Sequence, residues 1–564
     1  MSRYDTRRDR PGRLGGFTAA ALLACLALEP AAARAPKSSA PTPDALAQSA
    51  GRIEADVRFL ADDLLEGREA GTRGFDLAAL YVATQYRLIG LEPAGEDGSY
   101  FQRVPMVRGI RERERARFAV TRAGRTKEFA FETEFLPAIN FTAGSTEVTA
   151  PLVFVGQGVY APELQHDDFA GVDVRGRIAV LLNNAPARFP IDQRAFHASA
   201  SEKLRELERR GAVGAVFLGD PENEARRPWA LDAPNWQRPA MRRIDAQGLP
   251  ADDFPGLAVR VSASVAVAEA IFAGSPRTAA EVFALLKQGE LRAFDLGAEA
   301  TLSTRARLDR IESRNVIGRL PGGDARLAGE HVVFTAHLDH LGIGAPHGGD
   351  SIYNGAQDNA VGVATMLETA RLLAAGRKPP KRSMLFLALT AEEKGLLGAY
   401  HFAAEPTVPR ESLVANVNMD MPLLIGEVSD VVPIGIEHST LEAVVQRAVA
   451  EAGLTLTPDP LPEEVVFVRS DQYPFVRQGV PAIYLKSGVT LRDGGDGLAM
   501  VKDFRSNRYH LPNDDLGQPM HWPAAAQLAH VNYRIALAIG NDPVRPAWKP
   551  GNFFGEKFGG GRAR

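Results

Sequence analysis

The amino-acid sequence predicts an α/β fold in which a mainly parallel sheet is sandwiched by helices and carries a β-rich insertion. From Asn315 onward, short continuous apolar strands alternate with amphipathic helices, which is typical of a parallel sheet covered on both faces. Residues 115–160 instead alternate apolar and polar side chains, which is the two-residue period of strands with one exposed face. A chain of 564 residues is long enough for more than one domain.

The first 35 residues have the pattern of a signal peptide. Residues 3–13 contain five arginines, residues 17–28 form an apolar run, and mostly small residues follow up to position 35. We therefore expect export to the periplasm or secretion. The only cysteine, Cys25, lies in a segment that resembles a bacterial lipobox, so a lipid anchor at Cys25 is the alternative to ordinary cleavage. No later segment approaches the ~20 uninterrupted apolar residues of a transmembrane helix.

Changes in composition divide the rest of the chain. Residues 36–44 are rich in Pro, Ser and Ala and indicate a linker. Apolar residues at helical spacing predict two helices between positions 45 and 91, separated by a glycine-rich break at 67–74. We assign residues 45–135 to the first part of the main domain, 136–298 to the β-rich insertion, 299–545 to the rest of the main domain and 546–564 to a flexible tail.

The main domain is expected to contain four strands and four helices that alternate along the chain. The predicted strands are Val332–Ala336, Met384–Leu389, Leu413–Asn418 and Ala482–Leu485. The predicted helices are Ala360–Ala375, Lys394–Ala403, Leu441–Ala452 and Pro523–Ala538. In sheets of this kind, ligands bind at the carboxyl ends of the strands.

The composition excludes several classes of function. Lys and Arg total 65 and Asp and Glu total 69, so the formal charge is −4, which argues against nucleic acid as a partner. A single cysteine excludes an internal disulfide framework and a cysteine-rich metal site. Any bound metal must therefore be held by His, Asp and Glu. No Gly-x-Ser-x-Gly motif is present to support a serine mechanism.

Histidines and acids gather at or near the expected strand ends. Each has an ordinary explanation when taken alone, such as a helix cap for Asp358 or a solvated helix start for Glu392-Glu393. Together they offer five candidate ligands without a thiolate: His337, Asp358, one of the pair Glu392-Glu393, Asp420 and His510. This set suits zinc, with cobalt or manganese as alternatives. Five ligands exceed the three usual for one catalytic zinc, so two ions that share a carboxylate are expected.

Two further acids have expected roles beside the ligands. One member of the Glu392-Glu393 pair is free to accept a proton from the attacking water. Asp339 stands two residues after His337, where its carboxylate can accept the second N–H of the imidazole. His340 and His347 are interpreted as loop residues that complete no coordination. Asp514 is either an acid that orients another group or part of a solvated turn.

These segments resemble peptidase family M28, a family of zinc exopeptidases. The matching motifs are Thr335-Ala336-His337-Leu338-Asp339-His340, Gly355 to Gly362, Leu389 to Gly398, Asn418-Met419-Asp420 and Tyr509-His510. The resemblance implies that Asp358 bridges two zinc ions. It also implies that His337 and Asp420 complete the coordination of one ion and that Glu393 and His510 complete the coordination of the other.

The same resemblance implies roles for other parts of the chain. Glu392 is the expected general base, and Tyr509 is placed like the tyrosine that stabilises the oxyanion in some members. Residues 60–68 are similar to the amino-terminal part of these peptidases, and residues 156–180 are similar to the protease-associated domain inserted in many of them. One departure is Gln472, where relatives often carry a histidine that is not a ligand.

We expect an exported di-zinc aminopeptidase that hydrolyses peptides by attack of a metal-bound water, with Glu392 as the base. A carboxypeptidase or dipeptidase of the same fold is the alternative. It would need a cation to bind the substrate carboxylate, for which Arg469, Lys486 and Arg505 are candidates. A glutaminyl-cyclase-like enzyme and a non-catalytic receptor-like homologue are less favoured, because Glu392 and all five ligands are present.

Overall fold

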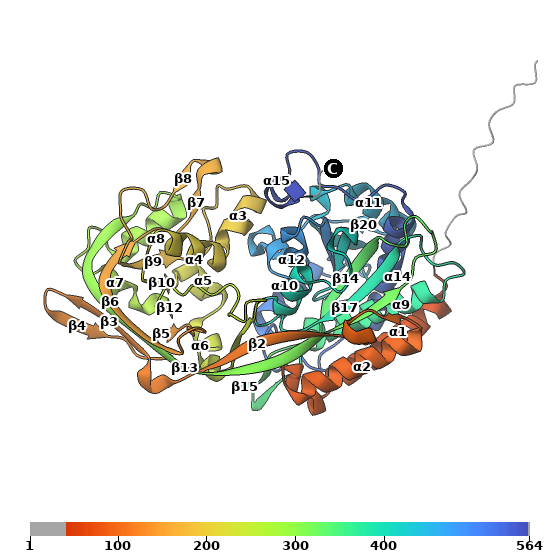
Figure 1. Ribbon diagram of the computed structural model, residues 1–564, viewed down its shortest axis with the longest axis horizontal. Helices are drawn as coiled ribbons and strands as arrows, with labels where there is room; N and C mark the ends of the chain where they lie inside the picture. The colour runs from red at the N-terminus through yellow and green to blue at the C-terminus, as the bar shows by residue number, and fades with distance from the viewer. Residues whose placement is uncertain (1–40, 562–564) are drawn as a thin grey trace, which may run out of the picture. The chain divides into compact units, whose positions relative to one another are not determined.

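The computed structural model describes residues 41–561 (Figure 1). Four parallel strands form the centre of the main sheet, in the order β17–β14–β18–β21. Their bounds are β14 (His331–His337), β17 (Ser383–Leu389), β18 (Leu413–Asn418) and β21 (Ala482–Ser487). All four coincide with predicted strands. The predicted parallel arrangement is therefore confirmed.

Antiparallel strands extend this sheet on both sides. β13 (Phe294–Leu320) pairs with β17, and β2 (Phe101–Arg111) pairs with β13. On the other side, β19 (Asp430–Ile434) runs antiparallel to β21. The sheet is therefore mixed at its margins and parallel at its centre.

Helices cover both faces of the main sheet. Val332 and Phe334 of β14 belong to a large core that also takes side chains from α1 (Pro43–Leu60), α2 (Arg73–Ile89), α9 (Val361–Ala374), α11 (Leu441–Glu451) and α14 (Trp522–Asn541). Val333, between them, points to a second core that includes residues of α10 (Leu397–Ala404) and α12 (Gln472–Arg477). Successive strand residues face opposite sides of the sheet. A strand that lies between two helical layers therefore needs apolar residues on both sides, which explains why these strands are continuously apolar.

The long strand β13 belongs to two sheets. Its residues 306–316 pair with β2 in the main sheet, whereas residues 299–303 pair with β3 (Arg117–Arg122) in a second sheet. The second sheet therefore begins at β3, before the expected start of the insertion at residue 136. Strand β11 (Ala240–Arg243), inside the expected insertion, pairs with β2 of the main sheet. Apolar alternation marks a strand but does not say which sheet the strand joins, which explains the difference.

The second sheet has a parallel part. Strand β9 (Ile178–Leu182) lies between β6 (Ser145–Phe154) and β10 (Gly214–Leu218), and β10 pairs in turn with β12 (Val259–Ala263). Helices α4 (Ala200–Arg209) and α8 (Ala279–Gln288) also belong to this region. The identity of this region as a protease-associated domain stays a prediction.

The C-terminal segment differs from the expected flexible tail. Residues 553–558 form helix α15 (Phe553–Phe558), and its Phe554 side chain is fully buried in a core shared with Phe467, Tyr473 and Tyr484. Aromatic residues in a glycine-rich stretch therefore anchor it to the main domain. The predicted signal peptide and Cys25 lie outside the described residues. Within residues 41–561, no helix is both long and apolar enough to cross a bilayer.

Candidate metal centre

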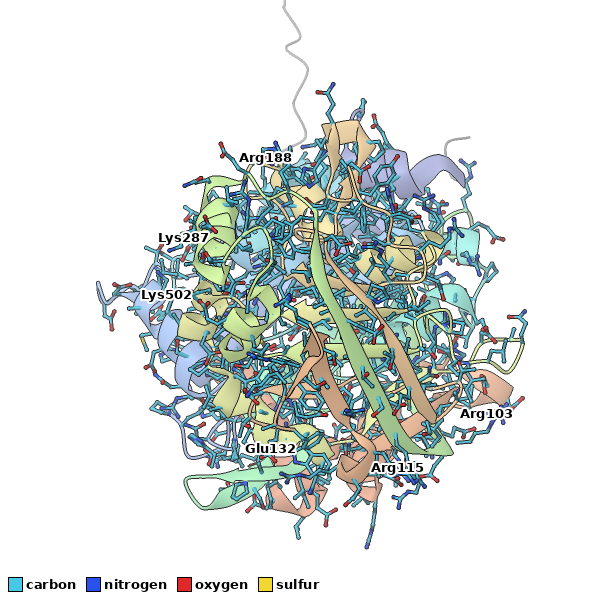
Figure 2. All side chains as sticks on the ribbon, turned by 90° about the vertical axis from the view of Figure 1, so that its left-hand side faces the viewer. Arg103, Arg115, Glu132, Arg188, Lys287 and Lys502 are labelled. Carbon is cyan, nitrogen blue, oxygen red and sulfur yellow. The ribbon has the colours of Figure 1, made fainter. Side chains whose placement is uncertain are left out.

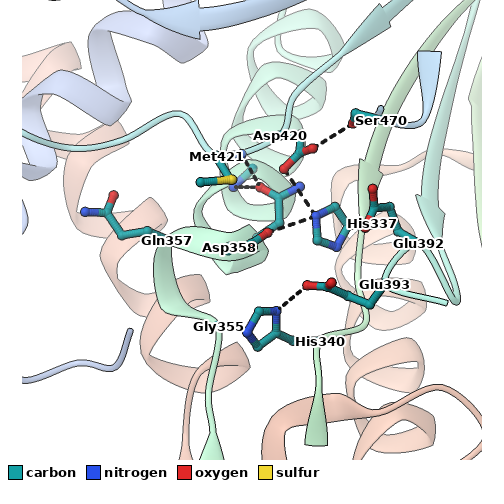
Figure 3. A network of polar contacts seen from close by, with 12 residues as sticks. His337, His340, Gly355, Gln357, Asp358, Glu392, Glu393, Asp420, Met421 and Ser470 are labelled. Atoms are coloured by element: carbon teal, nitrogen blue, oxygen red, sulfur yellow. Dashed lines mark hydrogen bonds and ion pairs between the residues drawn. The ribbon is translucent and has the colours of Figure 1, made fainter. Parts of the chain in front are cut away.

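The five predicted metal ligands meet at one edge of the main sheet. Figure 3 shows His337, Asp358, Glu393 and Asp420. His337 is the last residue of β14, Asp420 follows the end of β18, and Glu393 follows the end of β17. These strands are parallel neighbours, so their carboxyl ends share an edge. Asp358 reaches the same place from the turn before α9, and His510 comes from the loop after α13 (Gly497–Asn507).

The Asp358 carboxylate stands between the two histidines. Its Oδ1 lies 3.2 Å from Nε2 of His337, and its Oδ2 lies 3.4 Å from Nε2 of His510. Asp420 Oδ1 lies 3.2 Å from the same nitrogen of His337, and Glu393 Oε2 lies 3.1 Å from that of His510. The two oxygens of Asp358 thus belong to two different groups of ligand atoms.

These distances fit two zinc positions. Ligand atoms about 2.0–2.2 Å from a tetrahedral zinc lie about 3.3 Å from each other, and the four separations span 3.1–3.4 Å. The donors are imidazole nitrogens and carboxylate oxygens, which zinc accepts. Ligand atoms of His337, Asp358 and Asp420 also lie mutually within 4.8 Å, and so do those of His340, Asp358 and Glu393.

Glu393 is held from two sides by imidazoles. Besides the His510 contact, its Oε1 lies 2.7 Å from Nδ1 of His340, whose side chain is fully buried. Among the described residues, Oε1 of Glu393 and both ring nitrogens of His340 are buried without a hydrogen bond of ordinary geometry. Orphaned polar atoms are costly in a dry interior, and a bound cation would satisfy the Glu393 oxygen. His340 lies in the loop after β14, as interpreted, and its buried imidazole contacts the predicted ligand Glu393.

The charges of the cluster favour a bound cation. Burial alone would lower the pKa of His510, but the nearby Glu393 and Asp358 carboxylates outweigh burial and raise this pKa to about 9. Burial likewise opposes a charged His337, yet Glu392 and Asp420 raise its pKa well above the ordinary value. The acids thus hold the histidines in their charged form, and a metal ion would take the place of those protons.

Glu392 and Glu393 have different surroundings although they are adjacent. Burial, and then the charges of Glu393 and Asp420, raise the pKa of Glu392 well above the ordinary value despite the opposing charge of His337. The pKa of Glu393 is instead well below its ordinary value, because the charges and hydrogen bonds of His510 and His340 outweigh burial. The surroundings therefore favour the charged carboxylate at Glu393 and the protonated form at Glu392.

The structure corrects the expected contact of Asp339. Its carboxylate accepts the backbone N–H of Glu392 at 3.0 Å and that of Glu393 at 3.3 Å. The imidazole Nδ1 of His337 instead lies 3.1 Å from the backbone carbonyl oxygen of Asp339. The backbone of the extended segment thus orients the histidine, while the side chain of Asp339 fixes the turn that carries both glutamates.

Asp514 fixes the backbone at Asp358. Its buried carboxylate accepts the N–H of Gln357 at 2.9 Å and that of Asp358 at 3.0 Å. The next residue, Asn359, accepts the N–H of Met421 at 3.1 Å, which ties the turn to the loop that carries Asp420. Of the two interpretations of Asp514, the orienting acid is the one observed.

A second set of side chains fixes Asp420. The Ser470 hydroxyl donates to Oδ2 of Asp420 at 2.6 Å, and the Tyr484 hydroxyl donates to its backbone oxygen at 2.8 Å. Asn418 donates to Ser470 at 2.7 Å and to Gln472 at 2.9 Å. Sequence reasoning did not find Ser470 or Tyr484, although the Ser470–Gln472 segment drew attention through its departure from the family pattern.

Arg68 links the N-terminal region to the metal centre. Its guanidinium is fully buried and donates to three backbone oxygens. One belongs to Leu338, the residue after His337, and the others belong to Asn354 and Gly355, which precede Asp358. Burial lowers its pKa to about 10, so Arg68 keeps its charge at neutral pH. The resemblance of residues 60–68 to the family pointed to this segment without giving its role.

Tyr509 lies against the second histidine. Its ring stacks on that of His510, with ring centroids 3.8 Å apart. Burial, followed by the charges of Asp358 and Glu393, raises the pKa of Tyr509 well above the ordinary value, so its hydroxyl keeps its proton and remains a donor. Among the described residues no hydrogen bond of this hydroxyl is seen. An oxyanion role for Tyr509 therefore stays a prediction.

Comparisons with known proteins agree with this site. Residues 315–536 match the profile of peptidase family M28. Aminopeptidase YwaD of Bacillus subtilis (strain 168) is 32% identical over 139 residues, which are 24% of this chain and 27% of that protein. A glutamate carboxypeptidase 2 homolog of Caenorhabditis elegans is 24% identical over 344 residues, 53% of this chain and 41% of that protein. The chain thus spans less than half of each relative.

The fold is similar to that of solved aminopeptidase structures. An aminopeptidase from Aneurinibacillus sp. strain AM-1 superposes with a TM-score of 0.52 at 18% identity, over 87% of this chain and 93% of that chain. This likeness concerns the fold. The family profile covers β14, β17, β18 and all five predicted metal ligands. Taken with the aminopeptidase relatives, these findings support an M28 zinc aminopeptidase-like protein, in which residues 315–536 carry the family match.

Proposed function

We propose that this protein is an exported di-zinc metallopeptidase that removes N-terminal residues from peptides. The observation that carries the proposal is the split of the Asp358 carboxylate, with one oxygen beside His337 and the other beside His510. A carboxylate placed in this way bridges two metal ions in hydrolytic sites. Asp420 would complete the first ion and Glu393 the second.

Two zinc ions in these positions would supply electrophilic activation of the peptide carbonyl and stabilise the negative charge that develops on its oxygen. The chain's own residues perform the proton transfers. Glu392 is half-buried beside His337, and its raised pKa reflects burial among other acids. It would accept a proton from the attacking water and return that proton to the leaving amine.

Other residues would position these groups. The Asp339 carboxylate accepts the backbone N–H of Glu392 at 3.0 Å and so fixes the position of the backbone from which the base extends. Tyr509, with its retained proton, would donate a hydrogen bond to the substrate oxygen as negative charge develops. Cobalt or manganese would also suit these oxygen and nitrogen donors.

A matched set of tripeptides tests the proposal. The purified mature chain should be assayed on one peptide free at both ends, one N-acetylated and one C-amidated, with zinc and after chelation. An aminopeptidase loses cleavage on acetylation and still cuts the amidated peptide. Loss on amidation instead indicates the carboxypeptidase alternative, which the carboxypeptidase relative also suggests.

The Glu392→Gln variant separates the base from the metal ligands. We expect its kcat to fall by about 10²–10⁴-fold, while its zinc content stays at two ions per chain. Glu290→Gln, at an exposed glutamate of the second sheet region, is the matched control and should keep full activity. Full activity of Glu392→Gln, or of the chelated protein, would contradict the mechanism. N-terminal sequencing of the exported protein tests cleavage near residue 35 against lipidation of Cys25.

A further inference from the structure

A largely apolar pocket lies directly beside the metal centre. It is lined by Met421, the residue after Asp420, and by Arg505 of α13, the helix that leads to His510. Val432, Ile434, Leu461 and Val489 are among its apolar walls. A side chain or chain end of a peptide held at the metal centre would therefore lie close to this pocket.

Lys486, near the end of β21, brings an unpaired ammonium group into this pocket. Its Nζ stands 4.8 Å from the centre of the Tyr484 ring, and Tyr484 in turn donates to the backbone of Asp420. Among residues 41–561, no acceptor or carboxylate lies within hydrogen-bond or ion-pair distance of Nζ. Burial, and then the charge of Arg505, lower the pKa of Lys486 to about 8. An ammonium group in such a place is costly without an anion.

The other charged groups of the pocket already have partners or a distinct role. Arg505 forms an ion pair with Glu464 at 2.8 Å. Asp459 accepts the backbone N–H of Leu461 at 2.9 Å and attracts Lys486 only through its charge. Lys486 is thus the cation of this pocket whose hydrogen-bond donors are all uncommitted. A ligand that matches the pocket has an aliphatic part for the walls and a carboxylate for Nζ.

We propose that this pocket binds a carboxylate of the peptide substrate through Lys486 and so determines specificity. The inference rests on the proposed peptidase function. The carboxylate has two sources in a peptide, which are the side chain of a Glu or Asp residue next to the cleaved bond and the free C-terminus of a short substrate. In both cases the methylene groups would contact the apolar walls while Lys486 forms the ion pair.

Paired substrates distinguish the two sources. The tripeptides Glu-Ala-Ala and Gln-Ala-Ala differ only in side-chain charge, and Leu-Ala-Ala and its C-amide differ only in terminal charge. The wild-type protein should prefer the charged member of one pair by about tenfold or more in kcat/KM, as expected for a hydrogen bond to a charged group. A preference in the first pair indicates an acidic side chain. A preference in the second pair indicates the C-terminus if N-acetylation still abolishes cleavage, whereas cleavage of the acetylated peptide indicates the carboxypeptidase alternative instead.

Substitution of Lys486 tests its part in that preference. Lys486→Met keeps an unbranched side chain without the charge, and should abolish the preference while changing kcat/KM for the neutral member less than about threefold. Lys486→Arg should restore part of the preference. Lys502→Met, at an exposed lysine on α13 (Figure 2), is the matched control and should behave as wild type.

Two outcomes would overturn the inference. One is a wild-type protein that treats both members of each pair alike, and the other is a Lys486→Met variant that keeps the wild-type preference. Calorimetric titration with glutamate and glutamine separates this inference from the peptidase proposal. Glutamate should bind the zinc-loaded wild type about tenfold more tightly than it binds Lys486→Met, even if no peptide is cleaved. Equal binding of glutamate to both proteins would refute the proposed binding of a carboxylate by Lys486.

Discussion

Replacing His340 with alanine should weaken the binding of one zinc ion and leave the other nearly unchanged. His340 contacts Oε1 of Glu393 at 2.7 Å, whereas Oε2 of the same carboxylate faces His510 at 3.1 Å. The shorter distance is typical of a hydrogen bond, and the longer one of two atoms that bind the same ion. We therefore expect His340 to support Glu393, with His510 as the proposed ligand of the second ion.

The size of the effect follows from this contact. A hydrogen bond to a charged group contributes about 1.5–3 kcal/mol. The contact between His340 and Glu393 departs from ordinary hydrogen-bond geometry, so we take the lower end, about 1.5 kcal/mol. That value corresponds to about tenfold weaker binding of the second ion, within the range found for residues that support metal ligands.

Equilibrium competition with a chromophoric chelator measures both zinc affinities in one experiment. The matched control is His347→Ala, because His347 belongs to the same segment of chain but is exposed. Equal weakening of both ions, or no weakening of either, would refute the assignment of His340 to Glu393. Complete loss of one ion would make His340 a ligand in its own right and contradict the role given to His510.

Three further predictions concern stability and the support of Asp420. Burial and the charge of Arg319 lower the pKa of His331 to about 4. As the pH falls from 6.5 to 4, the unfolded chain binds the proton of this histidine first, so the free energy of unfolding should fall by about 3 kcal/mol. Urea unfolding of the wild type and of His331→Asn at pH 7 and pH 4 should show this loss in the wild type only. Ser470→Ala removes the 2.6 Å hydrogen bond to Asp420 and should weaken the first zinc ion by about 10–100-fold in the same chelator competition, whereas unchanged affinity would contradict its role. Gln472→His should keep the wild-type melting temperature within a few degrees because histidine also offers a donor and an acceptor, whereas Gln472→Leu leaves buried partners unsatisfied and should lower the free energy of unfolding by about 1–3 kcal/mol.

The central part of the fold could be predicted because its signals are local. Strands such as Val332–Ala336 and Leu413–Asn418 are short, continuously apolar and separated by helical patterns, and they lie at the centre of the sheet. The boundaries of the second sheet could not be predicted in the same way. β13 continues through both sheets without a break, so no turn signal marks the passage from one to the other.

The same contrast holds at the metal centre. His337 and Asp420 lie at the ends of neighbouring parallel strands, and parallel pairing alone brings them together. The supporting contacts depend instead on side-chain directions in loops. Ser470 reaches Asp420 across 50 positions of sequence, and Asp514 reaches the Asp358 backbone across 156. No periodicity in the sequence encodes such contacts, which is why the role of Asp339 was also predicted with the wrong partner.

These supporting contacts explain how a cluster rich in carboxylates can stay ordered before metal binds. The Asp358 backbone is fixed by Asp514 from the C-terminal region, and the turn before it is held by Arg68 from the N-terminal region. The loops that carry Asp358 and Asp420 are thus tied to elements outside the three strands that carry the site. A ligand set held by the fold loses little conformational freedom when the ions bind. We therefore expect Arg68, which is distant in sequence from every predicted ligand, to contribute to metal affinity.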